Sequence, residues 1–358
     1  MNKNDNQNNT NESVITSEQS GTSVQVVRRS NKKFFIIVAI FLTIAIGTIF
    51  AGITIFSNSI RNVNLVNNFV DGRFDDIESA ELLPETLQLN LAEISNLRIT
   101  SRNISIIVTP HSNPHVLITY EQNSEGQNEQ PRYRLTGTTL EIAQPNPPAT
   151  QGNWFNLIDN SSQNGVITVF FPENTDNIFD LLDILSVSGN IDITGNSGNF
   201  LANTLEISGT SANITALNFD ANAANFRSIS GRISADFISL GGDLEVRTTS
   251  GGVQIGNIIA SNTNLSSISG TLTADTIATG ELHINSTSGG VQVNLAELDS
   301  FYARAISGAL NVQNSSVASD ITMRTTSGNI TVNNVNYNGD YIDANSISGT
   351  IRIDGVVN

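Results

Sequence analysis

The stretch ISGTLTADTIATGELHINSTSGGVQVNLAELDSFYARAISG, residues 268–308, contains one short pattern three times. Ser-Gly pairs begin at Ser269, Ser288 and Ser307, so the pattern recurs at an equal interval. The third and fifth residues after each Ser are apolar or small, as at Leu272, and such alternation is typical of a β-strand with one buried face. The stretch therefore predicts short strands separated by a recurring turn.

Similar spacing continues through the C-terminal half of the chain. Stacking each repeat on the next would bury a continuous apolar column, which predicts an all-β parallel β-helix or β-solenoid of about 20 residues per coil. The Gly after each Ser suits a corner that demands positive φ or close approach of two backbones. The nine pairs begin at Ser188, Ser208, Ser230, Ser250, Ser269, Ser288, Ser307, Ser327 and Ser348.

Two irregularities accompany the repeat. The pair at Ser208 has Asn213 five residues later, where other repeats are apolar, and predicts a bulged coil. The residue before the Ser alternates between Ile and Thr from Ile229 to Ile347, which would also suit a unit of about 39 residues. We favour about 20 residues, because small side chains could hardly fill a coil of twice that size.

At ~1.5 Å per residue, the uncharged segment from Phe34 to Phe56 is long enough to span a bilayer as a helix. Arg28, Arg29, Lys32 and Lys33 precede it, so we expect a single-pass anchor with a cytoplasmic N-terminus and an extracellular C-terminal domain. A cleaved signal peptide is the alternative, although the apolar run exceeds the usual h-region.

We expect the chain to have five parts, and less regular strands to precede the repeats. Residues 1–33 form a disordered cytoplasmic tail, 34–56 the transmembrane helix and 57–86 a stalk with room for a short helix. Residues 87–185 form irregular β-strand opening or capping coils, and 186–358 the regular solenoid repeats.

Beyond the anchor, residues 57–358 hold 30 acidic residues against 12 Arg and no Lys. Nucleic acid is thus not an expected partner, because its binding needs basic groups that face phosphates. The chain has no Cys, which excludes disulfides and thiolate metal sites.

The chain resembles a widespread bacterial family of β-strand-repeat proteins with a putative-adhesin domain of unknown function. The resemblance rests on the anchor with its basic flank, LRITSRNISIIVTP at 97–110, ITVFFPENTDNIFDLLDILSVSGNIDI at 167–193 and the ISG and TSG repeats. It covers about residues 87–358, and it is similar to membrane-bound members of Gram-positive bacteria, some linked to envelope-stress systems. It implies no catalytic residues.

Some β-helices cleave glycans, but that chemistry needs clustered carboxylates. Asp236, Asp275 and Asp354 share one repeat position yet fall in alternate coils or further apart, too distant to share an ion. Gly241–Asp243 lacks the register of calcium-binding repeats, and His111 and His115 flank a Pro in a turn. We therefore expect no enzyme, metal site or cofactor.

The candidate partner surface has two parts. Arg227 and Arg247 share a repeat position in consecutive coils, as do Arg304 and Arg324, and such pairs could recognise carboxylate or phosphate unless Glu245, Asp243 or Asp320 neutralises them. Trp154 and Phe155 could contact carbohydrate or protein, or plug the first coils.

The expected function is a surface-exposed, non-enzymatic adhesion or cell-envelope interaction module whose partner is a protein or carbohydrate of the envelope. The alternatives are an accessory component of an envelope-stress signalling system and a glycan-cleaving β-helix enzyme.

Overall fold

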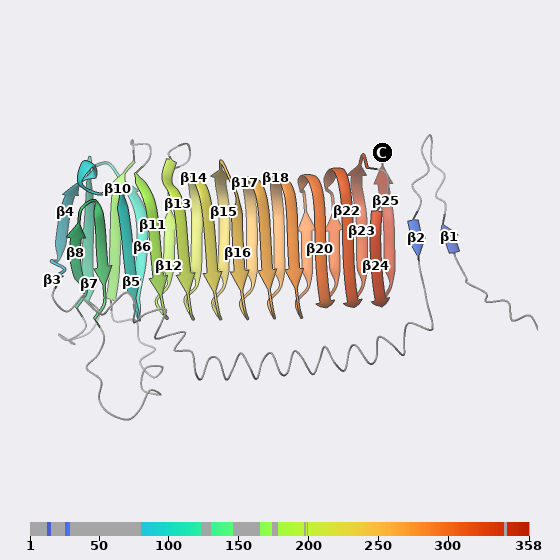
Figure 1. The fold of residues 1–358 in the computed structure, drawn as a ribbon, viewed down its shortest axis with the longest axis horizontal. Coiled ribbons are helices and arrows are strands. Elements are labelled where there is room, and N and C mark those ends of the chain that lie inside the picture. Colours follow the sequence, from blue (N-terminus) through green and yellow to red (C-terminus); the bar gives the residue numbers. More distant parts are fainter. Residues whose placement is uncertain are drawn as a thin grey trace, which may run out of the picture.

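The computed structural model describes residues 13–15, 26–28, 80–122, 130–145, 165–173, 178–196, 198, 200–339 and 342–357. From residue 80 on, all described strands belong to one sheet that winds into a parallel β-solenoid of about 9 turns (Figure 1). Ile233 pairs with Val253, and Val253 pairs with Leu272, so the three residues occupy the same place in consecutive coils. The expected unit of about 20 residues per coil is confirmed, and a coil of twice that length is excluded.

Strands of 15 residues, such as β17 (Val253–Ser267) and β18 (Leu272–Ser286), occur only in the regular part of the described solenoid, where shorter strands also occur. Within the described ranges, one 3-10 helix, η2 (Leu91–Glu93), interrupts the strands. The strands are β1 (Ser13–Ile15), β2 (Val26–Arg28), β3 (Glu81–Leu82), β4 (Thr86–Asn90), β5 (Asn96–Ser101), β6 (Ile104–His111), β7 (His115–Gln122), β8 (Arg132–Thr136), β9 (Thr139–Ala143), β10 (Gly165–Pro172), β11 (Phe179–Ser186), β12 (Ile191–Thr194), β13 (Phe200–Gly209), β14 (Ile214–Ser228), β15 (Ile233–Leu240), β16 (Leu244–Thr248), β17 (Val253–Ser267), β18 (Leu272–Ser286), β19 (Val291–Asn294), β20 (Glu297–Ser307), β21 (Leu310–Gln313), β22 (Ser316–Ser327), β23 (Ile330–Tyr337), β24 (Ile342–Ser348) and β25 (Ile351–Val357).

The first coils do not follow the order of the sequence. The coil of β5 and β6 lies between two later ones: β9 and β10 pair with its outer edge, and β11 and β12 with its inner edge. Beyond β9 and β10, the strands β3, β4, β7 and β8 pair antiparallel and close this end of the sheet. An antiparallel layer and a coil inserted out of order thus form this end of the sheet, in the region where the sequence predicts opening or capping coils.

The core is a single apolar column inside the coils. Residues at alternate positions point inward, so that Leu272, Ala274 and Ile277 of one coil are almost fully buried. Each stacks on the equivalent residue of the next coil, as Leu272 does on Val291. Burial of this column stabilises the stack by roughly 25 cal/mol for each Å² of apolar surface removed from water.

Close approach of the backbones explains the Gly of each Ser-Gly corner. A Cβ atom on Gly270 would lie 1.8 Å from the carbonyl oxygen of Gly251, and one on Gly251 would lie 1.8 Å from that of Gly231. Positive φ occurs instead at a second bend, where the residues are Asn218, Phe237, Asn257, Thr276, Leu295, Asn314 and Asn334.

The coil of Ser208 is irregular, as expected: the register of its strand β13 shifts between Phe200 and Ala202, and its corner is displaced. Ser208 pairs with Arg227 inside the strands, and the backbone N–H of Ser230 donates to the carbonyl of Thr210 at 2.8 Å. Ser211 and Ala212 therefore form the corner of this coil, three residues after the Ser-Gly pair. Ile214 then stands at the apolar position that the pattern counted from Ser208 lacks.

The expected transmembrane helix, residues 34–56, lies outside the described residues. All of residues 57–79 and most of residues 1–33 lie outside them too. Within 1–33 the structure has β1 and β2, which pair antiparallel. In the part of the chain that the structure describes, no helix has the length and apolar character needed to cross a membrane.

Candidate binding surfaces

The four candidate Arg residues lie in one outward column on the strands that lead into the corner. The register of this column runs Ser208, Arg227, Arg247, Ser266, Asn285, Arg304, Arg324 and Asn345. A second outward column, two residues earlier, runs Asp183, Glu206, Asn225, Glu245, Asn264, His283, Tyr302, Thr322 and Asp343. We call the two columns together the Arg face.

Glu245 neutralises the first Arg pair. Its carboxylate lies 3.5 Å from the guanidinium of Arg227 and forms a shorter ion pair with Arg247. The Arg227 Nε also donates to Asn225 at 3.1 Å. One of the three acids that the sequence offered as partners thus serves both arginines, whereas Asp243 accepts a hydrogen bond from Asn262 at 2.9 Å.

The second Arg pair is only half neutralised. Arg324 donates to Asp343 of the next coil at 2.7 Å, so Asp320 is not its partner. Among the described residues, Arg304 makes no hydrogen bond or ion pair, and its side chain is exposed. Arg304 therefore keeps an unpartnered positive charge in a strongly acidic protein.

Sequence reasoning missed the aromatic pair beside Arg304. The rings of His283 and Tyr302, in register on consecutive coils, stack with centroids 4.7 Å apart. The His283 Nε2 also lies 3.0 Å from a carboxylate oxygen of Glu281. The shared repeat position of His283, Tyr302 and Asp343 was the available signal.

Acids dominate the N-terminal part of the Arg face. Arg98 lies 3.8 Å from Glu141 and 3.7 Å from Asp183, and the pairs stack coil on coil. Glu206 follows Asp183 in the column, and burial raises the pKa of Glu206 although the nearby Arg227 lowers it. The charge of the face thus changes along the rod, from acids near Asp183 to arginines near Arg304.

The polar residues at the second bend form hydrogen-bonded ladders from coil to coil. The side-chain amide of Asn257 donates to Asp236 at 2.8 Å, and that of Asn334 donates to Asn314 at 2.8 Å. Asp236 and Asp275 are separated by the coil of Gly256, as expected. Within the described ranges, no three His, Asp, Glu or Cys residues are grouped so that they could hold a metal ion.

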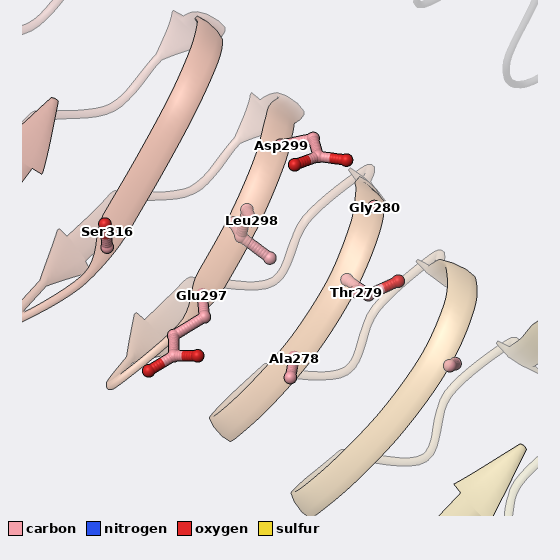
Figure 2. Close-up of a pocket in the computed structure, with 8 residues that line it drawn as sticks. Ala278, Thr279, Gly280, Glu297, Leu298, Asp299 and Ser316 are labelled. Atoms are coloured by element: carbon pink, nitrogen blue, oxygen red, sulfur yellow. The ribbon is translucent and has the colours of Figure 1, made fainter. Parts of the chain in front are cut away.

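A shallow groove of about 480 Å³ lies on another side of the rod. Figure 2 shows Glu297 and Asp299 on one coil, Ala278 and Gly280 on the preceding coil, and Ser316 beyond. The groove exists because Ala278 and Gly280 have small or no side chains. The carboxylates of Glu297 and Asp299 are exposed at its edge.

Two candidates from the sequence remain: the His111 and His115 pair, and the Trp154 and Phe155 pair. His111 Nε2 lies 2.8 Å from the carbonyl oxygen of His115, so the two residues close their own turn. Trp154 and Phe155 lie outside the described residues, and their role stays a prediction.

Comparisons with solved structures find distant likenesses. A putative adhesin from Parabacteroides distasonis is 12% identical, with a TM-score of 0.45, over 77% of this chain and 98% of that chain. One from Parabacteroides merdae is 10% identical, with a TM-score of 0.42, over 77% of this chain and 97% of that chain. A putative adhesin from Bacteroides fragilis is 14% identical, with a TM-score of 0.33, over 77% and 98%.

No curated protein matches the chain. A family model does: the model described as Toastrack DUF4097 matches residues 94–297 and again 240–357, which together extend over most of the chain. The resemblance to a β-strand-repeat family of unknown function is thereby confirmed, and the chain belongs to the Toastrack DUF4097 family.

Proposed function

We propose that the chain is a non-enzymatic binding module of the cell envelope, and that residues 34–56 hold its solenoid outside the membrane. The observation that carries the proposal is the position of the cap. Figure 1 shows β3, β4, β7 and β8 at one end of the rod and β24 and β25 at the other. Since the anchor segment precedes β3, the chain would enter the rod at its capped end.

A rod held by one end suits binding better than catalysis. At ~4.8 Å per coil, nine coils place the far end on the order of 40 Å from the cap. The outward columns repeat at each coil, and ion pairs such as Arg227 to Glu245 join neighbouring coils. Such a surface is rigid before binding, which lowers the entropy lost when a partner docks.

Adhesion of whole cells tests the proposal. The full chain would be expressed in a bacterium that lacks it, and adherence to immobilised cells or isolated envelopes would be compared with an empty-vector strain. We expect increased adherence, which added soluble protein competes away. Equal adherence of the two strains would contradict the proposal, as would new reducing ends when the full-length protein is incubated with cell-wall polysaccharides.

A further inference from the structure

The Ser-Gly corners form a ridge along the rod, and one charged side chain, the exposed Arg232, lies in their turns. At the corners from Ser188 to Ser307, the Ser backbone N–H donates to a carbonyl of the preceding coil's corner, as Ser269 does to Thr249 at 2.9 Å. The corner serines are exposed when Ser211 is counted in place of Ser208. The corner residues, which we call the corner column, are Val187, Thr210, Ile229, Thr249, Ile268, Thr287, Ile306, Thr326 and Ile347.

The Ile residues of this column are exposed. Ile229 is 48% exposed and Ile268 47%, whereas the apolar residues of the core are buried. The displaced corner at Ser211 extends the alternation by one coil, because Thr210 precedes Ile229 in the column. A large apolar residue therefore protrudes at every second coil, with a smaller Thr between, over eight successive corners.

We propose that this ridge binds the same ridge of a second copy of the chain, with the two rods antiparallel. Two ridges related by a twofold axis along the rod would place Ile opposite Ile and Thr opposite Thr. With the axis across the rods, each Ile can lie opposite a Thr, so protruding residues fill the spaces between those of the other copy. The alternation, which the fold itself does not require, thereby gains a physical reason.

The charges beside the ridge favour one antiparallel register. Placing Ile268 opposite Thr249 of the second copy also sets Ile306 opposite its Thr210. The coil of Arg304 then faces the coil that holds Glu206. Opposite charges at the rim of an interface steer encounter and fix register.

In the same register the first Arg pair meets no like charge. Arg227 lies opposite the coil of Asn285, and Arg247 opposite that of Ser266. A register shifted by two coils, with Ile268 opposite Thr287, would instead set Arg227 opposite Arg324. Arg304, which has no partner among the residues the structure describes, thus gains one across the interface.

A second copy of the chain would thus be one partner of the envelope binding module proposed above. The pairing of rods does not depend on that proposed function, but its effect in the cell does. Rods anchored in two facing membranes would pair antiparallel, whereas rods in one membrane would lie parallel. The ridge is narrow, so we expect a weak contact whose effect grows with the number of copies on each surface.

Cysteine crosslinking tests the register directly, because the natural chain has no Cys. Full-length Thr210→Cys and Ile306→Cys variants would be mixed in detergent and oxidised. We expect a covalent dimer from the mixture but little from Thr210→Cys alone, whose two thiols would lie five coils or ~24 Å apart. Efficient dimers of Thr210→Cys alone would show parallel pairing and overturn the proposal.

A fold-neutral variant provides the second test. Thr already occupies this position in alternate coils, so Ile229→Thr, Ile268→Thr and Ile306→Thr should combine without loss of the solenoid. We expect self-association, measured by sedimentation, to weaken at least about tenfold. Arg304→Gln should weaken it less, and the control Arg352→Gln, on a different side of the last coil, should not change it.

Vesicles separate this inference from the proposed function. Liposomes that carry the full chain should aggregate, and the triple Thr variant should abolish aggregation. If the wild-type chain is monomeric at all concentrations and its vesicles stay dispersed, the inference fails, even where the cells still adhere to envelopes. The inference would also fail if envelope material, but not a second copy of the chain, protected Thr210→Cys or Ile306→Cys from thiol labelling. The ridge would then bind a component of the envelope instead.

Discussion

The carbonyl oxygen of Gly270 occupies the place where a side chain on Gly289 would begin, since a Cβ built there falls 1.8 Å away. Gly289→Ala must therefore separate two stacked corners, and we expect it to lower the free energy of unfolding by about 3 kcal/mol. The neighbouring Gly290 has its nearest atom at 3.9 Å, so Gly290→Ala is the matched control. Urea unfolding of both variants measures the difference, and equal stabilities would contradict the close stacking.

The bend opposite the corner holds non-Gly residues in the left-handed region. Thr276 has a φ of 54°, which is unfavourable for a β-branched residue, whereas Asn tolerates it. We expect Thr276→Asn to stabilise the solenoid by about 0.5–1 kcal/mol in thermal unfolding. Thr273→Asn, in the same coil but within a strand, should not stabilise it. A loss of stability in Thr276→Asn would argue that the Thr side chain has a role at the bend.

The sequence predicted the coil length and the buried positions because both follow from spacing. Leu272 and Val291 fall at the same offset from a Ser and do stack. The displaced corner beside Ser208 was not predicted for the same reason: a Ser-Gly pair within a strand looks identical to one at a corner, and only the pairing register separates them. Local pattern also carries no information about long-range strand order, so the insertion of β5 and β6 between later coils was not predicted.

The candidate site could be predicted only in part. The Arg column followed from the repeat, as did Glu245 as the partner of Arg227 and Arg247. Asp343 as the partner of Arg324 was not predicted, because it reaches Arg324 from the next coil, which depends on side-chain conformation.

Burial of Glu206 makes stability depend on pH. Because burial raises the pKa of Glu206, the folded state holds its proton at pH values where the unfolded state has lost it. Stability from this residue is therefore present at low pH and is lost as pH rises through the folded pKa. We expect Glu206→Gln to unfold at a higher urea concentration than wild type at neutral pH, with a smaller difference in mildly acidic buffer. The exposed Glu297→Gln is the control for loss of one charge, and a pH-independent effect at Glu206 would contradict the burial argument.

Removal of Glu245 should leave two unshielded arginines on consecutive coils. We expect Glu245→Gln to lower the free energy of unfolding by about 0.5–1 kcal/mol at low ionic strength, because Arg227 and Arg247 then repel each other. Salt should reduce the loss, since these side chains are partly exposed. The control Glu281→Gln removes an acid whose partner is His283. Chemical unfolding at two salt concentrations checks this, and a loss that salt does not change would point to packing.

The central claim is that the solenoid stands outside the cell, and labelling of single cysteines in intact cells tests it most directly. The natural chain has no Cys, and Ser250 is exposed at a corner of the described rod. A membrane-impermeant maleimide should label Ser250→Cys in intact cells, whereas Ser20→Cys, which precedes the anchor segment, should be labelled only after lysis. Labelling of Ser250→Cys that requires lysis would contradict the account.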